Sequence, residues 1–84
     1  MSAYIDRVHF RKFTDIHRRY PILEALSDDS ILFDLSASDE GTIECAIHEG
    51  AANRIFRLED FKRYLDDGVV KLKAEMSATD AEGR

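Results

Sequence analysis

Cysteine is almost missing from this sequence of 84 residues, since Cys45 is the only one. An internal disulfide is therefore excluded, and so is a zinc site built from several cysteines. Cys45 and His48 stand in Cys-x-x-His spacing, but an odd separation along a strand sends two side chains to opposite faces. We therefore expect no cofactor and no metal site, and a buried, unreactive thiol at Cys45.

Long apolar runs and catalytic signatures are missing as well. No apolar stretch approaches the roughly 18 residues of a membrane span, and the N-terminus lacks the apolar core of a secretion signal. The four glycines are isolated, so there is no glycine-rich phosphate loop, and His48-Glu49 is not followed by the second histidine of a metalloprotease helix. These absences predict a cytoplasmic protein that is not an enzyme and does not enter a membrane. An active site completed across a dimer stays open as an alternative.

Basic residues are absent from 21–53, a segment that carries eight acidic residues. Residues 1–20 hold five bases against two acids, and residues 54–84 balance seven against seven, which returns the net charge of −5. A basic segment followed by an acidic one can attract within one fold, between two copies, or toward a foreign partner. The overall negative charge argues against binding to nucleic acid, whose phosphates would be repelled.

A β-hairpin over 31–48 is the clearest element of the sequence. Apolar side chains occupy the odd positions in both halves: Ile31, Phe33, Leu35, Ile43, Cys45 and Ile47. If Ser38 faces Thr42, the loop is 39–41, and Gly41 takes the left-handed conformation of a three-residue hairpin loop. This register sets Leu35 opposite Cys45, and it places both apolar rows on one face of the sheet.

An amphipathic helix follows a short third strand predicted over 54–57. The helix has apolar residues three or four apart from Leu58 to Met76, which places them on one stripe. Gly68 is its weak point, and a helix ending at Asp67 followed by a fourth strand over 69–74 is the alternative. We expect one domain over 1–76 and a flexible tail over 77–84, because the tail has nothing apolar to bury.

The N-terminal segment fits a helix over 3–19, because its apolar residues fall within one broad arc at 100° per residue. Pro21 would clash with the carbonyl of His17, so a short second helix is expected from about Pro21 to Asp28. Lys12 lies inside the apolar arc, and the alternation of Val8, His9 and Phe10 leaves a strand open. The expected fold is therefore α+β: an N-terminal helix or helix pair, a three-stranded antiparallel meander and a C-terminal amphipathic helix. Both long helices are expected to pack on the face of the sheet that carries Phe33, Leu35, Ile43, Cys45 and Ile47.

A binding surface is expected on the exposed side of the N-terminal helix and on the acidic hairpin. The candidate partner-binding residues are Arg7, Phe10, Arg11, His17, Arg18, Asp34, Glu44 and Glu49. Arginine beside an aromatic residue is typical of protein interfaces. We expect a small intracellular protein that binds another protein as an adaptor, subunit or inhibitor, with a homodimer as one form. The alternative is a nucleic-acid-binding regulator that uses the basic helix face.

Overall fold

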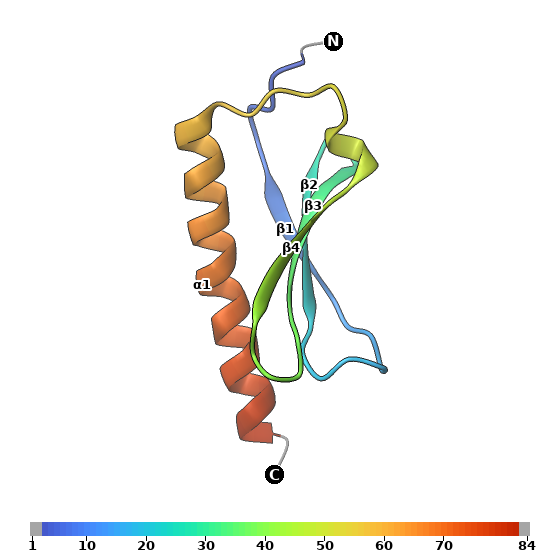
Figure 1. Ribbon diagram of the computed structural model, residues 1–84, viewed down its shortest axis with the longest axis vertical. Coiled ribbons are helices and arrows are strands. Elements are labelled where there is room, and N and C mark those ends of the chain that lie inside the picture. Colours follow the sequence, from blue (N-terminus) through green and yellow to red (C-terminus); the bar gives the residue numbers. More distant parts are fainter. Residues whose placement is uncertain (1–2, 83–84) are drawn as a thin grey trace.

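Four strands and one long helix make up the fold (Figure 1). A computed structural model describes residues 3–82. The elements are β1 (His9–Phe13), β2 (Ile22–Ser27), β3 (Ser30–Ala37), β4 (Ile43–Ile47), the short 3-10 helix η1 (Glu49–Ala51) and α1 (Leu58–Glu82). The strands form one antiparallel sheet in the order β1-β2-β3-β4, and α1 packs against one face of it.

The predicted hairpin and its register are confirmed in β3 and β4. Leu35 lies opposite Cys45 and Phe33 lies opposite Ile47. The Ser38 N–H donates to the Thr42 carbonyl at 2.9 Å, which closes the loop. Gly41 has a φ of +92°, a conformation that strains any residue with a Cβ. Local turn chemistry and side-chain alternation were sufficient to define this part of the sheet.

The predicted N-terminal helix over 3–19 and the helix starting near Pro21 are wrong. In the described part of the chain, these residues form β1, a loop over 14–21 and β2. Ile16, which belonged to the helical apolar arc, is 91% exposed. Lys12, which did not fit that arc, reaches Glu75 of α1. Pairing with β3 satisfies the backbone of β2, and β2 in turn pairs with β1, so sheet formation outweighs a helical pattern of only moderate quality.

The three-stranded meander is also wrong, because the sheet has four strands. The segment expected as its third strand lies outside the four strands, and its Ile55 forms an isolated parallel bridge with Tyr4. The Ile5 N–H donates to the Ile55 carbonyl at 2.8 Å. The segment before β1 is thereby tied to the linker that leads into α1.

Strands β2 and β3 are joined by a two-residue turn in which Ser27 lies opposite Ser30. Asp28 and Asp29 have φ values of 52° and 65°, the left-handed pair that a type I′ hairpin turn requires. Aspartate tolerates this conformation better than most residues with a Cβ, because its short polar side chain can bond locally. The segment that the sequence suggested as a helix end is therefore a hairpin turn.

The prediction of one continuous helix through Gly68 is confirmed, and the alternative fourth strand over 69–74 is not formed. Helix α1 runs to Glu82, so it includes residues 77–82 of the segment expected as a flexible tail; residues 83–84 lie outside the described residues. Near this end, the Tyr20 hydroxyl donates to Asp80 at 2.9 Å. Burial and this hydrogen bond raise the pKa of Tyr20.

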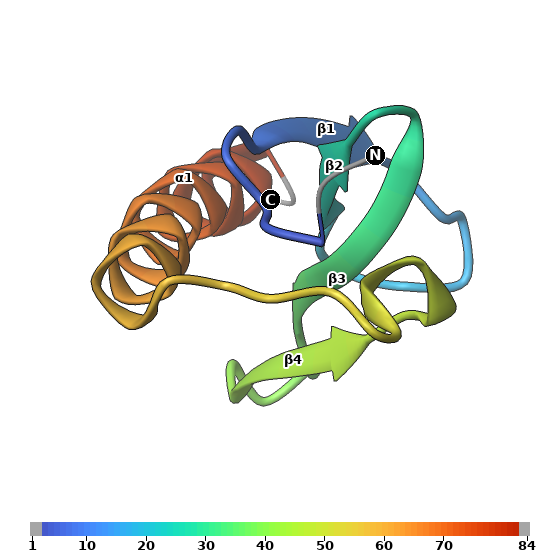
Figure 2. The same cartoon turned by 90° about the horizontal axis from the view of Figure 1, so that it is seen from above.

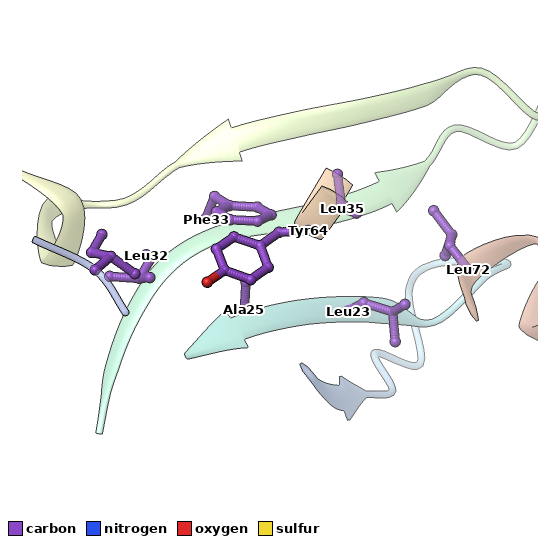
Figure 3. Packing of buried hydrophobic residues seen from close by; sticks show 8 residues of the cluster. Leu23, Ala25, Leu32, Phe33, Leu35, Tyr64 and Leu72 are labelled. Carbon is purple, nitrogen blue, oxygen red and sulfur yellow. The ribbon is translucent and has the colours of Figure 1, made fainter. Parts of the chain in front are cut away.

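The core lies between α1 and the central strands (Figure 3). Its buried members are Ile5, Leu23, Ala25, Leu32, Phe33, Leu35, Tyr64 and Leu72. Phe33 is the aromatic centre, with its ring edge-on to Phe10 at 6.3 Å and to Phe61 at 5.7 Å between centroids. The helix lies close to the sheet at Gly68, where an added Cβ would overlap Leu35 and lie 2.9 Å from Phe10.

Candidate protein-binding edge of the sheet

The outer strands β1 and β4 differ in how their open edges are protected. On β1, Lys12 Nζ lies 3.2 Å from Glu75 Oε1 of α1. The neighbouring Arg11 pairs with Glu24 of β2 at 2.7 Å. Charged side chains, lysine above all, discourage an open strand edge from pairing with another chain. The β1 edge is therefore protected by its own basic residues and by the helix beside it.

Strand β4 has no such protection. It contains no lysine, arginine or proline, its register with β3 is continuous, and Glu44 is its one charged residue. Ile47 is 64% exposed, Cys45 is exposed, and Ile43 is half-buried. An apolar row therefore lies open along an outer strand. We call the side chains of Ile43, Cys45 and Ile47, together with the outward-facing backbone of these three residues, the β4 surface.

The position of α1 explains why the β4 surface is open. The helix packs against β2 and β3, and Gly68 sits over Leu35 of β3 and Phe10 of β1. Figure 2 shows α1 next to β1, with β4 at the other margin of the sheet. A helix is about 10–12 Å across and strands are about 4.8 Å apart, so one helix covers two to three strands. The fourth strand is left without a cover.

An apolar flank of α1 lies at the edge of the core, where its members Leu65, Val69 and Met76 pack against the buried cluster. Leu58, Leu65, Val69 and Met76 lie within about 40° of one another around the helix axis. Leu58 is exposed and the other three are half-buried. Glu75, which bonds Lys12 of β1, lies about 100° from the centre of this flank. The flank therefore faces a different direction from the side of α1 that contacts Lys12 of β1.

The backbone of β4 alternates between its neighbour and the open edge. The His48 N–H donates to the Leu32 carbonyl at 2.8 Å, and the Thr42 carbonyl accepts from the Ser38 N–H. Because antiparallel ladders alternate, the even residues of β4 direct their backbone groups toward β3. The N–H and C=O groups of Ile43, Cys45 and Ile47 therefore point outward. The same three residues supply the apolar row and the open hydrogen-bonding edge.

The opposite face of the sheet carries paired charged residues at its centre. Glu24 of β2 lies opposite Asp34 of β3, and this pair of like charges would be unfavourable if it stood alone. Arg11 compensates Glu24 on one side, and His48 Nε2 lies 2.6 Å from Asp34 on the other. His48 is therefore on the face opposite to Cys45, as its spacing predicted.

The predicted burial of Cys45 is wrong, because its side chain is exposed on the open row of β4. Its predicted row and register were correct, but nothing in residues 3–82 covers the row at that point. Partial desolvation by neighbouring groups raises the pKa of the Cys45 thiol, and the negative charge of Asp34 adds to this rise. The thiol is accessible, with less thiolate than an ordinary cysteine would have at the same pH.

The basic residues expected to share one helix face are dispersed in the structure. Arg7 is exposed ahead of β1, and Arg11 is paired within the sheet. Arg18 lies in the loop over 14–21, where its guanidinium donates to the Ala37 carbonyl at 3.4 Å. In the same loop, the exposed His17 directs its backbone N–H to Asp15 Oδ1 at 2.9 Å. These residues do not assemble into the expected surface.

Phe10 was expected beside that basic surface as an exposed aromatic residue. It is half-buried instead, edge-on to Phe33 and beneath Gly68 of α1. Among the acidic candidates, Asp34 is paired with His48. Glu44 and Glu49 are exposed on β4 and on η1, which follows it. Of the predicted site residues, Glu44 and Glu49 are therefore the two that border the β4 surface.

Ile43, Cys45 and Ile47 were assigned to the core by sequence reasoning, so the β4 surface was missed. Alternation showed correctly that the three residues share a face, but alternation does not reveal whether another element covers that face. A signal was present in the composition of the edge. A strand without lysine, arginine or proline has none of the features that protect an outer strand.

The described residues hold no constellation typical of a small-molecule site. Within 3–82 there is no pocket, and no three His, Cys, Asp or Glu side chains are placed to share a metal ion. No helix in this range is long and apolar enough to cross a membrane. No family model, no curated protein and no solved structure matches the chain.

Proposed function

We propose that this chain is a small non-enzymatic protein that acts by binding another polypeptide along the β4 surface. One observation carries the proposal: the open apolar row and the outward-facing hydrogen-bonding groups belong to the same three residues. Strand addition uses this combination, since backbone pairing supplies affinity while alternate side chains select the partner. Glu44 and Glu49 would border such an interface and bias it against acidic partners.

The contrast between the two outer strands supports the proposal. Protection of β1 by Lys12, Arg11 and the nearby helix is what a monomeric sheet needs in order to avoid association. Strand β4 has neither basic side chains nor a helix beside its edge. A protein that works as a monomer is expected to protect such an edge. The nucleic-acid alternative depended on a basic helical face, and residues 3–20 contain no helix, so we do not propose it.

A pair of lysine substitutions tests the proposal. Ile47→Lys places a charge in the open row, whereas Val70→Lys places the same charge on α1, where Val70 is 69% exposed. Both sites are exposed, so both variants should keep the circular dichroism spectrum and unfolding temperature of the parent. The tagged parent and both variants are then used to capture proteins from native cell extract.

We expect Ile47→Lys to reduce recovery of a bound protein by at least about tenfold, as loss of an interface hot spot does. Val70→Lys should leave recovery unchanged. A partner retained equally by the parent and by Ile47→Lys would show that binding uses a different surface. Recovery that disappears on nuclease treatment would replace protein binding with nucleic-acid binding.

A further inference from the structure

We propose that the polypeptide on the β4 surface is a second copy of this chain, paired antiparallel about a two-fold axis that passes by Cys45. This inference rests on the proposed function and specifies its partner. Two copies joined in this way would form one continuous sheet in which β4 is no longer an outer strand. A closed two-fold contact also limits the assembly to a dimer, because each copy uses the same edge once.

The backbone pattern favours a register centred on Cys45. In this register, Cys45 lies opposite Cys45 of the second copy, and Ile43 lies opposite Ile47 of the second copy. All three residues with outward-facing groups then form hydrogen-bonded pairs. If the two-fold axis passed by Glu44 or by Ala46 instead, one of the three outward-facing residues would have no strand residue of the second copy opposite it. The Cys45 register therefore uses the open edge completely.

The side chains favour the same register. It sets apolar residues against apolar residues on one face, and it sets Glu44 opposite Ala46 of the second copy on the other. A register centred on Glu44 would oppose Glu44 to its own copy, and like charges directly opposite are unfavourable. If the register shifted by one residue, the apolar residues of one copy would lie opposite the even-numbered residues of the other copy. The sequence of β4 is thus self-complementary in one register.

The two-fold axis also brings the apolar surfaces of both copies to one side of the joined sheet. Antiparallel strands related by an axis perpendicular to the sheet keep equivalent faces together, so both α1 helices lie on the same face. The two open rows then lie next to each other between the helices. Association therefore concentrates exposed apolar area that each monomer leaves separate.

Pairing of β4 with β1 of another copy would instead produce an open chain of molecules. The ion pair between Lys12 and Glu75 sits at that edge and would stand in the way of an incoming strand. This difference favours the closed β4–β4 arrangement over a filament.

Amide exchange gives the most direct test, because the pairing changes alternate residues. In a monomer, the N–H groups of Ile43, Cys45 and Ile47 face solvent, while those of Glu44 and Ala46 face β3. Dimerisation should slow exchange at the three odd residues by at least about tenfold as protein concentration rises, and leave the two even residues protected throughout. Sedimentation of the same samples should show the monomer mass doubling over the same range.

Cross-linking at Cys45 tests the register. Hydrogen-bonded antiparallel pairs have Cα atoms about 5.5 Å apart, so a short bis-maleimide can join the two Cys45 thiols. Because the chain has a single cysteine, any covalent dimer must be joined there. We expect efficient cross-linking for the parent and for Val70→Lys, and loss of both cross-linking and the dimer mass for Ile47→Lys.

A monomer mass at all concentrations, with fast exchange at the three odd residues, would overturn the second-copy inference. If Ile47→Lys still abolished capture of a foreign protein, the proposed function would survive that result. A dimer that persists in Ile47→Lys without cross-linking through Cys45 would overturn the β4 contact. Uniform protection of odd and even residues with a monomer mass would contradict the backbone pattern from which the inference starts.

Discussion

Replacing Gly68 by alanine separates two opposing effects at the contact between helix and sheet. Alanine is about 1 kcal/mol more favourable than glycine inside a helix, so helix propensity alone predicts a stabilised protein. The added Cβ, however, would overlap Leu35 Cδ1 and would lie 2.9 Å from Phe10 Cζ and 3.0 Å from its Cε1. Relief of this overlap requires a movement of side chains or of the helix.

The packing cost should exceed the gain in propensity. Leu35 is only 2% exposed, so its side chain has little free space in which to move, and the half-buried Phe10 is held edge-on to Phe33. Inserting a methyl group into a filled core costs about 1–3 kcal/mol. After subtraction of about 1 kcal/mol for propensity, we expect Gly68→Ala to lower the free energy of unfolding by about 1 kcal/mol.

Urea unfolding followed by circular dichroism measures this change, with Leu35→Val as the matched background. Valine has no Cδ atom, so it removes the principal overlap while keeping an apolar residue in β3. In that background Gly68→Ala should become neutral or stabilising by up to about 1 kcal/mol. The reversal of sign would identify packing against Leu35 as the cause. A gain in stability for Gly68→Ala in the parent protein would refute the close approach of α1 at this point.

Two further predictions concern the turn between β2 and β3 and the contact between Tyr20 and α1. Asp29→Gly should raise stability by about 0.5–1 kcal/mol in thermal unfolding, because glycine adopts the left-handed conformation at φ 65° without strain. Asp29→Ala is the control, because it removes the same charge but keeps the Cβ. An equal gain in stability from Asp29→Ala would show that the lost charge, and not the backbone conformation, is the cause. Burial and the hydrogen bond to Asp80 raise the pKa of Tyr20, so its contribution to stability is present below the unfolded-state value of about 10 and is lost as pH rises through the raised value. Tyr20→Phe should therefore flatten the alkaline part of a stability-against-pH curve, and an unchanged curve would contradict this assignment.

Sequence reasoning succeeded where neighbouring residues determine the structure. The hairpin of β3 and β4 depends on side-chain alternation and on Gly41, and both signals lie within a short stretch of the chain. The register followed from the pairing of Ser38 with Thr42, and the structure shows that pairing. Helix α1 was predicted for a similar reason, since its apolar residues recur at helical spacing over many turns.

Sequence reasoning failed where strand pairing between distant residues decides the structure. The apolar residues of 3–20 fit a helical arc, yet Ile16 points to solvent. The turn at Asp28 and Asp29 lacks the glycine that usually marks a type I′ hairpin, so the connection of β2 to β3 was hidden. Without that hairpin, β2 has no visible partner, and β1 has none without β2. One missed turn therefore accounts for two missed strands.

The prediction of an N-terminal helix in place of β1 and β2 also explains why Cys45 and Ile47 were expected to be buried. Two long helices on one face would cover about 20–24 Å, more than the roughly 15 Å between the first and last of four strands. One helix of about 10–12 Å covers only part of the roughly 15 Å, so a four-stranded sheet with a single helix leaves some of its apolar face open. The helix lies over Phe10 and Leu35, toward β1, and the uncovered part is therefore β4. The open β4 surface thus follows from the number of strands and helices and from the position of the one helix.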